Sequence, residues 1–211
     1  MDRTAYYRSV GLNADDDSVV VGIAARLNPV KDIATLIRGF ARAHASCPNL
    51  RLLIAGDGEQ RAMLEGLARD LGVDPFVCFA GWISDTNTFY QSIDINTLTS
   101  LSETFPYALT EGARACLPTV SSRVGGVPYL IDHGVNGLLF SPGDADELAR
   151  HLITLARDPV QRQHLGCRLR QKGVEEYSLE STVRRQLEIY QIVLRRKDRR
   201  GTVGRRDGAL V

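Results

Sequence analysis

The chain has 211 residues, of which 44% are hydrophobic and 24% charged, a balance typical of one soluble globular domain of generous size. Its net charge of +1 argues against a partner held by overall charge, so nucleic acid is not expected. No stretch approaches the ~20 consecutive apolar residues of a membrane span, and the polar start, Met1 to Val10, predicts no signal peptide.

The cysteines indicate a compartment. Cys47, Cys78, Cys116 and Cys167 are scattered singly, without the C-x-x-C pair of a metal or redox motif. Single cysteines in a chain of this length are typical of a reducing compartment. We therefore expect a cytoplasmic protein, which could still be peripheral at the inner membrane face.

Strand-like and helix-like patterns alternate along the chain after a polar lead-in segment, residues 1–17. Strands are predicted at 19–25, 50–55, 76–80, 95–98, 119–122 and 137–140. Helices are predicted at 33–45, 59–71, 85–92, 106–116, 144–157, 160–172 and 179–194. Short apolar strands separated by helices predict βαβ units, and therefore an α/β fold with a Rossmann-like open parallel sheet, helices on both faces and C-terminal helices.

The predicted domain covers residues 18–196, and a basic tail, residues 197–211, is predicted to be disordered. The seven Arg and Lys residues from Arg195 to Arg206 allow a weak contact with anionic lipid. An idle, solvated tail is the alternative that we favour.

An open parallel sheet binds its ligands at the carboxyl ends of its strands, which directs attention to the loops there. Arg26 and Lys31 follow the first predicted strand, where two cations can meet a phosphate or can be ordinary surface charges. Gly56-Asp57-Gly58 follows the second strand, as a close approach to a ligand or as a plain turn. Gly125-Gly126 leaves the same two interpretations open.

The most informative segment surrounds the predicted helix that begins at Pro106. The first N–H groups of that helix, at Tyr107 and Ala108, would form an anion site. Glu103 before it and Glu111 inside it are acceptors for hydroxyl groups, although a surface Glu and a capping Glu are the plainer interpretation. A nucleoside-diphosphate sugar carries both the phosphates and the vicinal hydroxyls that this arrangement suits.

The ordered set of motifs resembles the C-terminal, donor-binding domain of family-4-type (group 1) retaining glycosyltransferases, whose fold is called GT-B. The resemblance extends over residues 18 to 160. The matching segments, in chain order, are Ala25-Arg26-Leu27 with Lys31, Ile54-Ala55-Gly56-Asp57-Gly58, Phe79-Ala80-Gly81, Asp94, Glu103 to Glu111 (the E-x7-E signature), Gly125-Gly126 and Gly134-Val135-Asn136-Gly137.

The resemblance implies a role for each matching residue. Arg26 and Lys31 would neutralise the donor diphosphate, which is the leaving group, and Glu103 would hold the transferred sugar; these three are the candidate catalytic residues. Glu111 would bind the ribose. The remaining candidate substrate-binding residues are Thr104, Phe105, Pro106, Tyr107, Ala108, Gly56, Gly81, Trp82, Ile83, Gly125 and Gly126. Trp82 would border the base, with a position in the core as an equal alternative.

The resemblance further implies a UDP-, GDP- or ADP-sugar donor, no cofactor and no metal, because cations and a helix N-terminus would take the charge. Three positions depart from the family pattern: Ala25, Asp32 and Thr104 stand where glycine is frequent. Thr104 puts the sugar specificity in doubt.

An acceptor-binding N-terminal domain of the kind that these enzymes use has no counterpart in the chain. An excised domain, a truncated product and one piece of a split enzyme all stay open. The alternative functions are a nucleotide-sugar epimerase, which the absence of histidine from the candidate loops disfavours, and a non-catalytic nucleotide-sugar-binding module.

Overall fold

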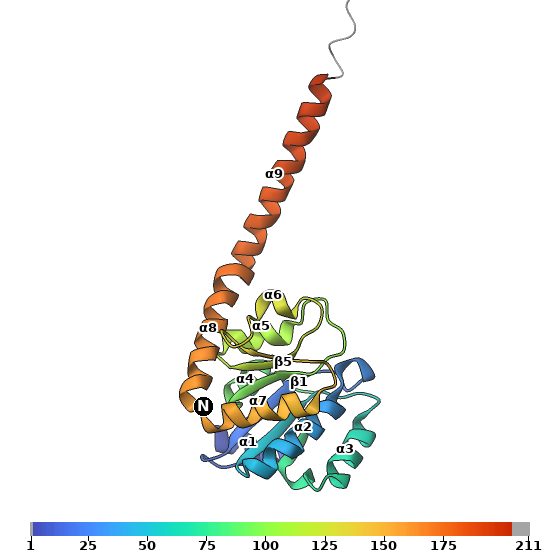
Figure 1. Cartoon of the computed structure of the whole chain (residues 1–211), viewed down its shortest axis with the longest axis vertical. Helices are drawn as coiled ribbons and strands as arrows, with labels where there is room; N and C mark the ends of the chain where they lie inside the picture. The colour runs from blue at the N-terminus through green and yellow to red at the C-terminus, as the bar shows by residue number, and fades with distance from the viewer. Residues whose placement is uncertain (1, 204–211) are drawn as a thin grey trace, which may run out of the picture. The chain divides into compact units, whose positions relative to one another are not determined.

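The computed structural model describes the backbone of residues 2–203 and the side chains of residues 2–195. The chain divides into two compact units, Met1–Gly173 and Val174–Val211. The first unit contains the sheet and the candidate site, and Figure 1 shows its helices on both faces of the sheet. Each unit is described by itself.

The sheet has six parallel strands in the order β3-β2-β1-β4-β5-β6. The strands are β1 (Val19–Ala24), β2 (Leu50–Ala55), β3 (Val77–Gly81), β4 (Ile95–Leu98), β5 (Thr119–Ser122) and β6 (Leu138–Phe140). The chain moves outward from β1 to β3 and then returns to place β4 on the other side of β1. This reversal leaves a crevice at the carboxyl ends of β1 and β4, where doubly wound sheets bind ligands.

The helices connect these strands. They are α1 (Arg3–Val10), α2 (Ile33–Ser46), α3 (Arg61–Asp70), α4 (Thr86–Ser92), α5 (Tyr107–Arg114), α6 (Val127–Leu130), α7 (Ala145–Arg157), α8 (Pro159–Tyr177) and α9 (Leu179–Val203), with short 3-10 turns η1 (Pro29–Lys31) and η2 (Asp74–Phe76). The predicted open parallel sheet with helices on both faces is therefore confirmed.

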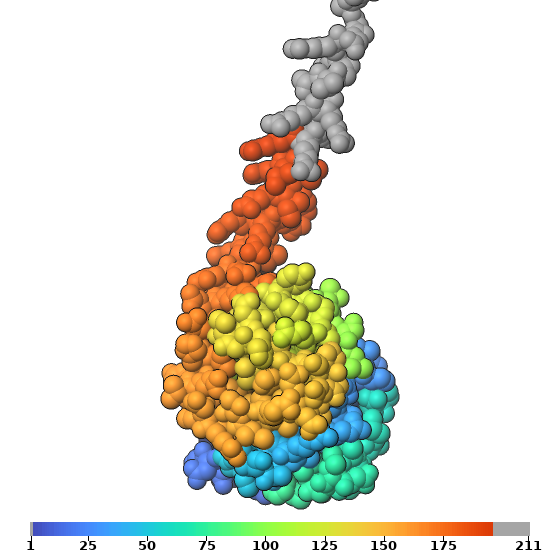
Figure 2. Space-filling view, viewed as in Figure 1, coloured from blue at the N-terminus to red at the C-terminus, as the bar shows by residue number. Residues whose placement is uncertain are grey.

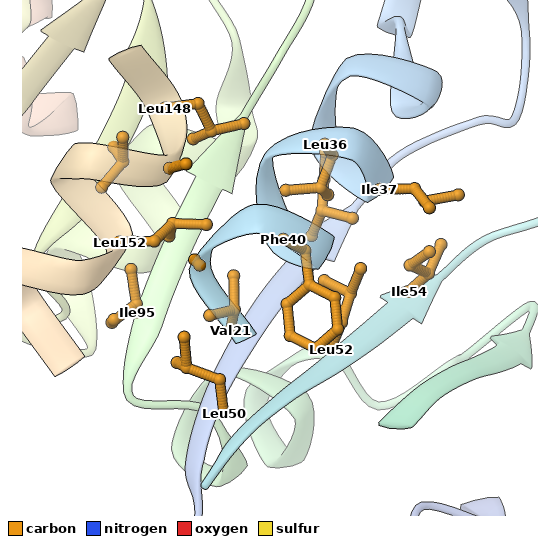
Figure 3. Packing of buried hydrophobic residues seen from close by; sticks show 14 of the residues in the cluster. Val21, Leu36, Ile37, Phe40, Leu50, Leu52, Ile54, Ile95, Leu148 and Leu152 are labelled. Atoms are coloured by element: carbon orange, nitrogen blue, oxygen red, sulfur yellow. The ribbon is translucent and has the colours of Figure 1, made fainter. Parts of the chain in front are cut away.

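Both faces of the sheet are buried, as expected of a parallel sheet covered by helices. Strand β1 is apolar throughout, whereas β4 and β5 also bury polar side chains, which are Asn96, Thr97, Thr119, Ser121 and Ser122. In β1, Val19 and Val21 belong to one hydrophobic cluster and Val20 to the other, because successive side chains point to opposite faces. Helices α2, α3 and α7 cover the first cluster, and α1 and α4 cover the second. Figure 3 shows Phe40 of α2 packed above the strands, close to Leu52.

Helices α2 and α7 lie in close contact, although a hundred residues separate them. A Cβ atom on Gly39 would come within 2.9 Å of the Leu148 side chain, so glycine permits this approach. Leu152 of α7 is fully buried in the same cluster. In the space-filling view of Figure 2, the light orange segment that contains α7 lies beside the blue segment of α2.

The N-terminal segment corrects the predicted boundary at residue 18. Residues 3–10 form α1 and belong to the first unit. Tyr7 is only 2% exposed and donates a hydrogen bond to the Ser92 carbonyl, while Arg3 pairs with Asp94 at 2.7 Å. Sequence periodicity did not indicate this helix because it is short and mostly polar.

The second unit consists of the end of α8 and of α9, which presents exposed apolar side chains such as Leu179, Val183 and Leu187. Helix α9 continues to Val203. The prediction of a disordered tail from residue 197 onward is therefore wrong for residues 197–203, which are helical. The rest of the predicted disordered tail, residues 204–211, lies outside the described residues, and lipid contact stays a prediction. Within residues 2–203, none of the helices has the length and hydropathy needed to span a bilayer.

Candidate functional site

The loops after β1, β2 and β3 are fastened to one another by backbone contacts. The Gly56 N–H donates to the Gly81 carbonyl at 2.7 Å, and the Ala25 N–H donates to the Ala55 carbonyl at 2.9 Å. A Cβ atom on Gly56, whose φ is 129°, would lie 1.9 Å from the Ala25 carbonyl oxygen. Glycine is therefore required at position 56 by the neighbouring loop, whatever ligand the crevice binds.

Three polar side chains from the loops after β1 and β4 form what we call the inner cluster: Lys31, Ser100 and Glu103. Lys31 Nζ lies 2.5 Å from Glu103 Oε1, and Ser100 Oγ donates to the same oxygen at 2.6 Å. The Lys31 and Glu103 side chains are 25% and 11% exposed. An ion pair this sheltered is screened less by salt than a surface pair.

Neighbouring side chains fix the inner cluster in place. Thr99 Oγ1 donates to the Lys31 carbonyl at 2.8 Å, and Ser122 Oγ donates to the Ser100 carbonyl at 2.6 Å. Both Thr99 and Ser122 are fully buried. The ends of β1, β4 and β5 thus position the cluster together.

The Gly125-Gly126 turn packs directly against the chain that carries Glu103. Gly125 has a φ of 48°, and a Cβ atom there would lie 1.5 Å from the Glu103 carbonyl oxygen. On Gly126 a Cβ atom would lie 2.1 Å from the Thr104 carbonyl oxygen. The close approach that we expected toward a ligand is thus made, at least in part, toward the backbone of Glu103 and Thr104.

Helix α5 begins directly after this loop, with Pro106 as its N-cap residue. The Pro106 side chain provides no cap, and the Leu109 N–H donates to the Pro106 carbonyl at 3.1 Å. The N–H groups of Tyr107 and Ala108 come before it in the first turn, where helices bind anions. Tyr107 is 78% exposed, Thr104 is exposed, and Phe105 and Ala108 are half-buried. The structure therefore places the predicted anion site beside the inner cluster.

A second group, which we call the outer rim, consists of Arg26, Asp57 and Trp82. The Arg26 side chain is 72% exposed and reaches Glu59 only at 3.9 Å, and Trp82 is 84% exposed. The interpretation of Trp82 as a core residue is therefore wrong. The outer rim borders a hollow of about 490 Å³, whose lining residues are Ala24, Ala25, Arg26, Ala55, Gly56, Asp57, Trp82, Ile83 and Thr86.

Glu111 faces a smaller hollow of about 230 Å³, lined also by Thr86, Tyr90 and Arg114. Because Thr86 lines both hollows, the two meet at this residue. Glu111 is exposed, and its Oε2 accepts a hydrogen bond of 3.0 Å from the Tyr90 hydroxyl. No motif in the sequence pointed to Tyr90, because it lies on α4 and meets Glu111 only through the packing of α4 near α5.

Two residues of the matching motifs act within the scaffold instead of facing the crevice. Asp94 accepts a hydrogen bond of 2.8 Å from the Val20 N–H and pairs with Arg3, so it fixes the start of β1. The side chain of Asn136 is buried and accepts from the Asp132 N–H at 2.7 Å, which closes the turn before β6.

The structure explains the departure at Asp32. This residue has a φ of 43°, in the left-handed region that glycine tolerates best. Its side chain accepts a hydrogen bond from the Thr35 N–H at 3.3 Å and caps α2. The cap offsets part of the backbone strain, since aspartate is among the best N-cap residues.

Two kinds of catalytic group, histidine side chains and metal-binding clusters, are relevant to the candidate site. Of the described residues that line them, none is a histidine. Within the described part of the chain, no group of three or more His, Cys, Asp or Glu side chains is arranged to hold a metal ion. Independence from metal stays a prediction, because the phosphate oxygens of a substrate can themselves coordinate a metal ion.

Comparison with known proteins identifies related chains. The sequence profile of the family described as glycosyl transferases group 1 matches residues 9–172. The lipopolysaccharide core biosynthesis glycosyltransferase LpsE of Rhizobium meliloti is 34% identical over 170 residues, which cover 81% of this chain and 49% of LpsE. The chain therefore spans about half the length of this curated relative.

Solved structures resemble the fold closely. Anabaena HepE in complex with UDP-glucose superposes with a TM-score of 0.80 and 26% identity, covering 90% of this chain and 52% of HepE. The C-terminal domain of the group 1 glycosyl transferase LpcC from Francisella tularensis gives a TM-score of 0.75 at 20% identity, covering 84% of this chain and 94% of that domain. The fold is thus one half of the GT-B architecture.

Proposed function

Because the chain belongs to the group 1 glycosyl transferases, we propose that its first unit binds the nucleotide-sugar donor of a retaining glycosyl transfer reaction. The observation that carries this proposal is the arrangement at the carboxyl ends of β1 and β4. There Lys31 and Glu103 meet just before the first turn of α5. The two hollows that meet at Thr86 are lined by other residues of the loops after β1, β2 and β3 and by α4 and α5. The UDP-glucose complex of HepE supports a donor of this class.

The donor diphosphate would lie between the cations and the start of α5. Lys31 and Arg26 would stabilise the negative charge that develops on the leaving diphosphate, together with the N–H groups of Tyr107 and Ala108. These groups replace the divalent cation that a charged leaving group otherwise requires. We therefore propose a donor site that works without metal.

The sugar and the nucleoside would occupy opposite sides of the diphosphate. Glu103 can accept hydrogen bonds from sugar hydroxyl groups once Lys31 turns toward the phosphates. Glu111 can accept hydrogen bonds from the ribose, and the base would enter the larger hollow beside Trp82 and Ile83. The mostly apolar lining of that hollow suits a planar base.

The chain by itself would bind the donor without transferring the sugar. Holding the acceptor hydroxyl beside the anomeric carbon can lower the barrier by ~7–11 kcal/mol. The described residues of this chain form one parallel sheet, whereas a GT-B enzyme has two sheet domains. The remaining half of a full-length relative would supply the acceptor site and exclude water.

Calorimetry on the purified chain tests donor binding. We expect one of UDP, GDP and ADP, and the matching nucleotide sugar, to bind and to raise the melting temperature with EDTA present. Replacing Lys31 with Ala is the matched control, since it should weaken binding of the nucleoside diphosphate far more than binding of the bare nucleoside. If none of the nucleotides binds at millimolar concentration, the proposal is wrong.

A transfer assay tests the proposal that the chain alone does not transfer the sugar. With a donor and candidate acceptors, release of nucleoside diphosphate should stay at background until the N-terminal half of a relative such as LpsE is added. Robust transfer by the chain alone, at a rate independent of self-association, would show that this half is not needed. Epimerisation of the sugar without an acceptor would instead favour the epimerase alternative. Donor binding without turnover, even when the acceptors and the N-terminal half are present, would favour a non-catalytic binding module.

A further inference from the structure

Tyr90 is a buried ionisable residue to which the proposed donor site assigns no role. It lies on α4, is only 3% exposed, and its hydroxyl donates a hydrogen bond of 3.0 Å to Glu111 Oε2 on α5. Twenty-one positions separate the two residues. The bond therefore depends on how α4 and α5 pack, and it points at the carboxylate proposed to bind the ribose.

The two partners differ in how firmly they are held. The Tyr90 ring belongs to the hydrophobic cluster around α1 and α4 and packs edge-on against Phe89, with ring centroids 5.1 Å apart. Glu111 is exposed, and three rotatable bonds let its carboxylate move. The hydrogen bond thus ties a mobile acceptor to a rigid support.

The direction of this bond is fixed by the protonation of the phenol. Burial, and after it the negative charge of Glu111, raise the pKa of Tyr90 well above its ordinary range. The hydroxyl therefore keeps its proton at physiological pH and acts as a donor to Oε2. The second oxygen, Oε1, and the remaining lone pairs of the carboxylate stay available to ligand hydroxyl groups.

We propose that Tyr90 is a positioning residue that orients the Glu111 carboxylate toward the hydroxyl groups of the donor ribose. This inference rests on the proposed function, because it specifies how the same site recognises the nucleoside. Tyr90 lines the same hollow as Glu111, and its proposed role is to act through the Glu111 carboxylate. Its effect should therefore depend on the presence of ribose hydroxyl groups in the ligand.

The variant Tyr90→Phe tests the inference, since it removes one oxygen and keeps the ring in the core. The probes are the nucleoside diphosphate that binds the wild-type chain and its 2′,3′-dideoxy counterpart, measured by calorimetry. We expect the affinity for the ribose form to fall about three- to tenfold, the scale of one lost orienting hydrogen bond. The affinity for the dideoxy form should change by less than about twofold.

Tyr7→Phe is the matched control. Tyr7 is 2% exposed, belongs to the same hydrophobic cluster and donates its hydroxyl to the Ser92 carbonyl, outside both hollows. This variant should leave the affinity ratio of ribose to dideoxy forms unchanged. If both variants change that ratio alike, general loosening explains the effect and the inference is wrong.

A double-mutant cycle with Glu111→Gln separates the possible failures. In the Glu111→Gln background, Tyr90→Phe should lower the affinity for the ribose form less than it does in the wild-type chain, since the two residues act as one unit. A wild-type chain that prefers the ribose form, combined with an unchanged ratio in Tyr90→Phe, refutes the inference and spares the proposed function. A wild-type chain that binds no nucleoside diphosphate refutes both.

Discussion

The inner cluster and the outer rim both lie in loops at the carboxyl ends of the strands but are built in opposite ways. In the inner cluster, Lys31 and Glu103 are bonded to each other and largely sheltered from water. In the outer rim, Arg26 and Trp82 are 72% and 84% exposed, and the Arg26 guanidinium lies 3.9 Å from the Glu59 carboxylate. The same edge of the sheet thus combines groups that are already partnered with groups that are mostly solvated.

This difference indicates which side chains would lose a protein contact when a ligand binds. A diphosphate that binds Lys31 competes with Glu103 for the ammonium group, so binding weakens or replaces a contact that the protein already makes. Arg26 gives up mainly water and little protein contact. We therefore expect changes in the inner cluster to affect both stability and binding, and changes in the outer rim to affect binding alone.

The largest effect is expected for Gly125→Ala. The new Cβ atom would meet the Glu103 carbonyl oxygen at 1.5 Å, at a φ of 48°. Relieving this clash has to displace the backbone of the inner cluster, so the free energy of unfolding should fall by about 2–4 kcal/mol, and binding of the diphosphate should weaken. Denaturant titration and calorimetry measure the two effects.

Gly134→Ala is the control for this prediction. Gly134 has a φ of 78°, but no atom lies within 4 Å of the position of its missing Cβ. Backbone strain without a clash should cost only ~1 kcal/mol. Equal losses in the two variants would mean that the contact with Glu103 is unimportant.

The next effect is the loss of a cation. Lys31→Ala should weaken binding of a nucleoside diphosphate ten- to hundredfold, since hydrogen bonds to charged groups contribute ~1.5–3 kcal/mol, and should leave the bare nucleoside nearly unaffected. Arg26→Ala should show the same selectivity with a smaller loss, because its side chain is more solvated. Calorimetry measures the binding of both ligands to both variants. If binding of the diphosphate and of the nucleoside weakened equally, Lys31 and Arg26 would not be the residues that bind the diphosphate.

Double-mutant cycles on the unliganded chain compare the two ion pairs directly. Lys31→Met combined with Glu103→Gln should reveal a coupling of about 1–2 kcal/mol in the free energy of unfolding, as expected of contacting, half-buried partners. The cycle for Arg26 and Glu59, separated by 3.9 Å and exposed, should give about 0–0.5 kcal/mol. Equal couplings would remove the distinction between cluster and rim.

The smallest change in stability is expected for Trp82→Ala. Because the indole is 84% exposed, the free energy of unfolding should stay within about 0.5 kcal/mol of the wild-type value. Nucleotide binding should nevertheless weaken by ~1 kcal/mol if the base stacks on the ring. Unchanged affinity for the whole nucleotide, while inorganic pyrophosphate binds as before, would place the base elsewhere.

Local patterns in the sequence predicted most of the fold. The apolar runs of β1 and β2 and the helical periodicity of α2 and α7 are properties of neighbouring residues, so they can be recognised without tertiary information. The motifs then identified the family and gathered the candidate residues at one edge of the sheet. The short helices α1 and α6 were missed because eight and four residues carry too little periodicity.

The sequence by itself determined which residues lie at the carboxyl ends of the strands, but only the tertiary structure decided how they are partnered. The pairs Lys31 with Glu103 and Tyr90 with Glu111 are 72 and 21 positions apart. They meet because β4 returns to lie beside β1 and because α4 packs near α5. The approach of Gly125 to Glu103 likewise requires β5 beside β4. Contacts of this kind arise from the order of strands and the packing of helices, which no local pattern encodes.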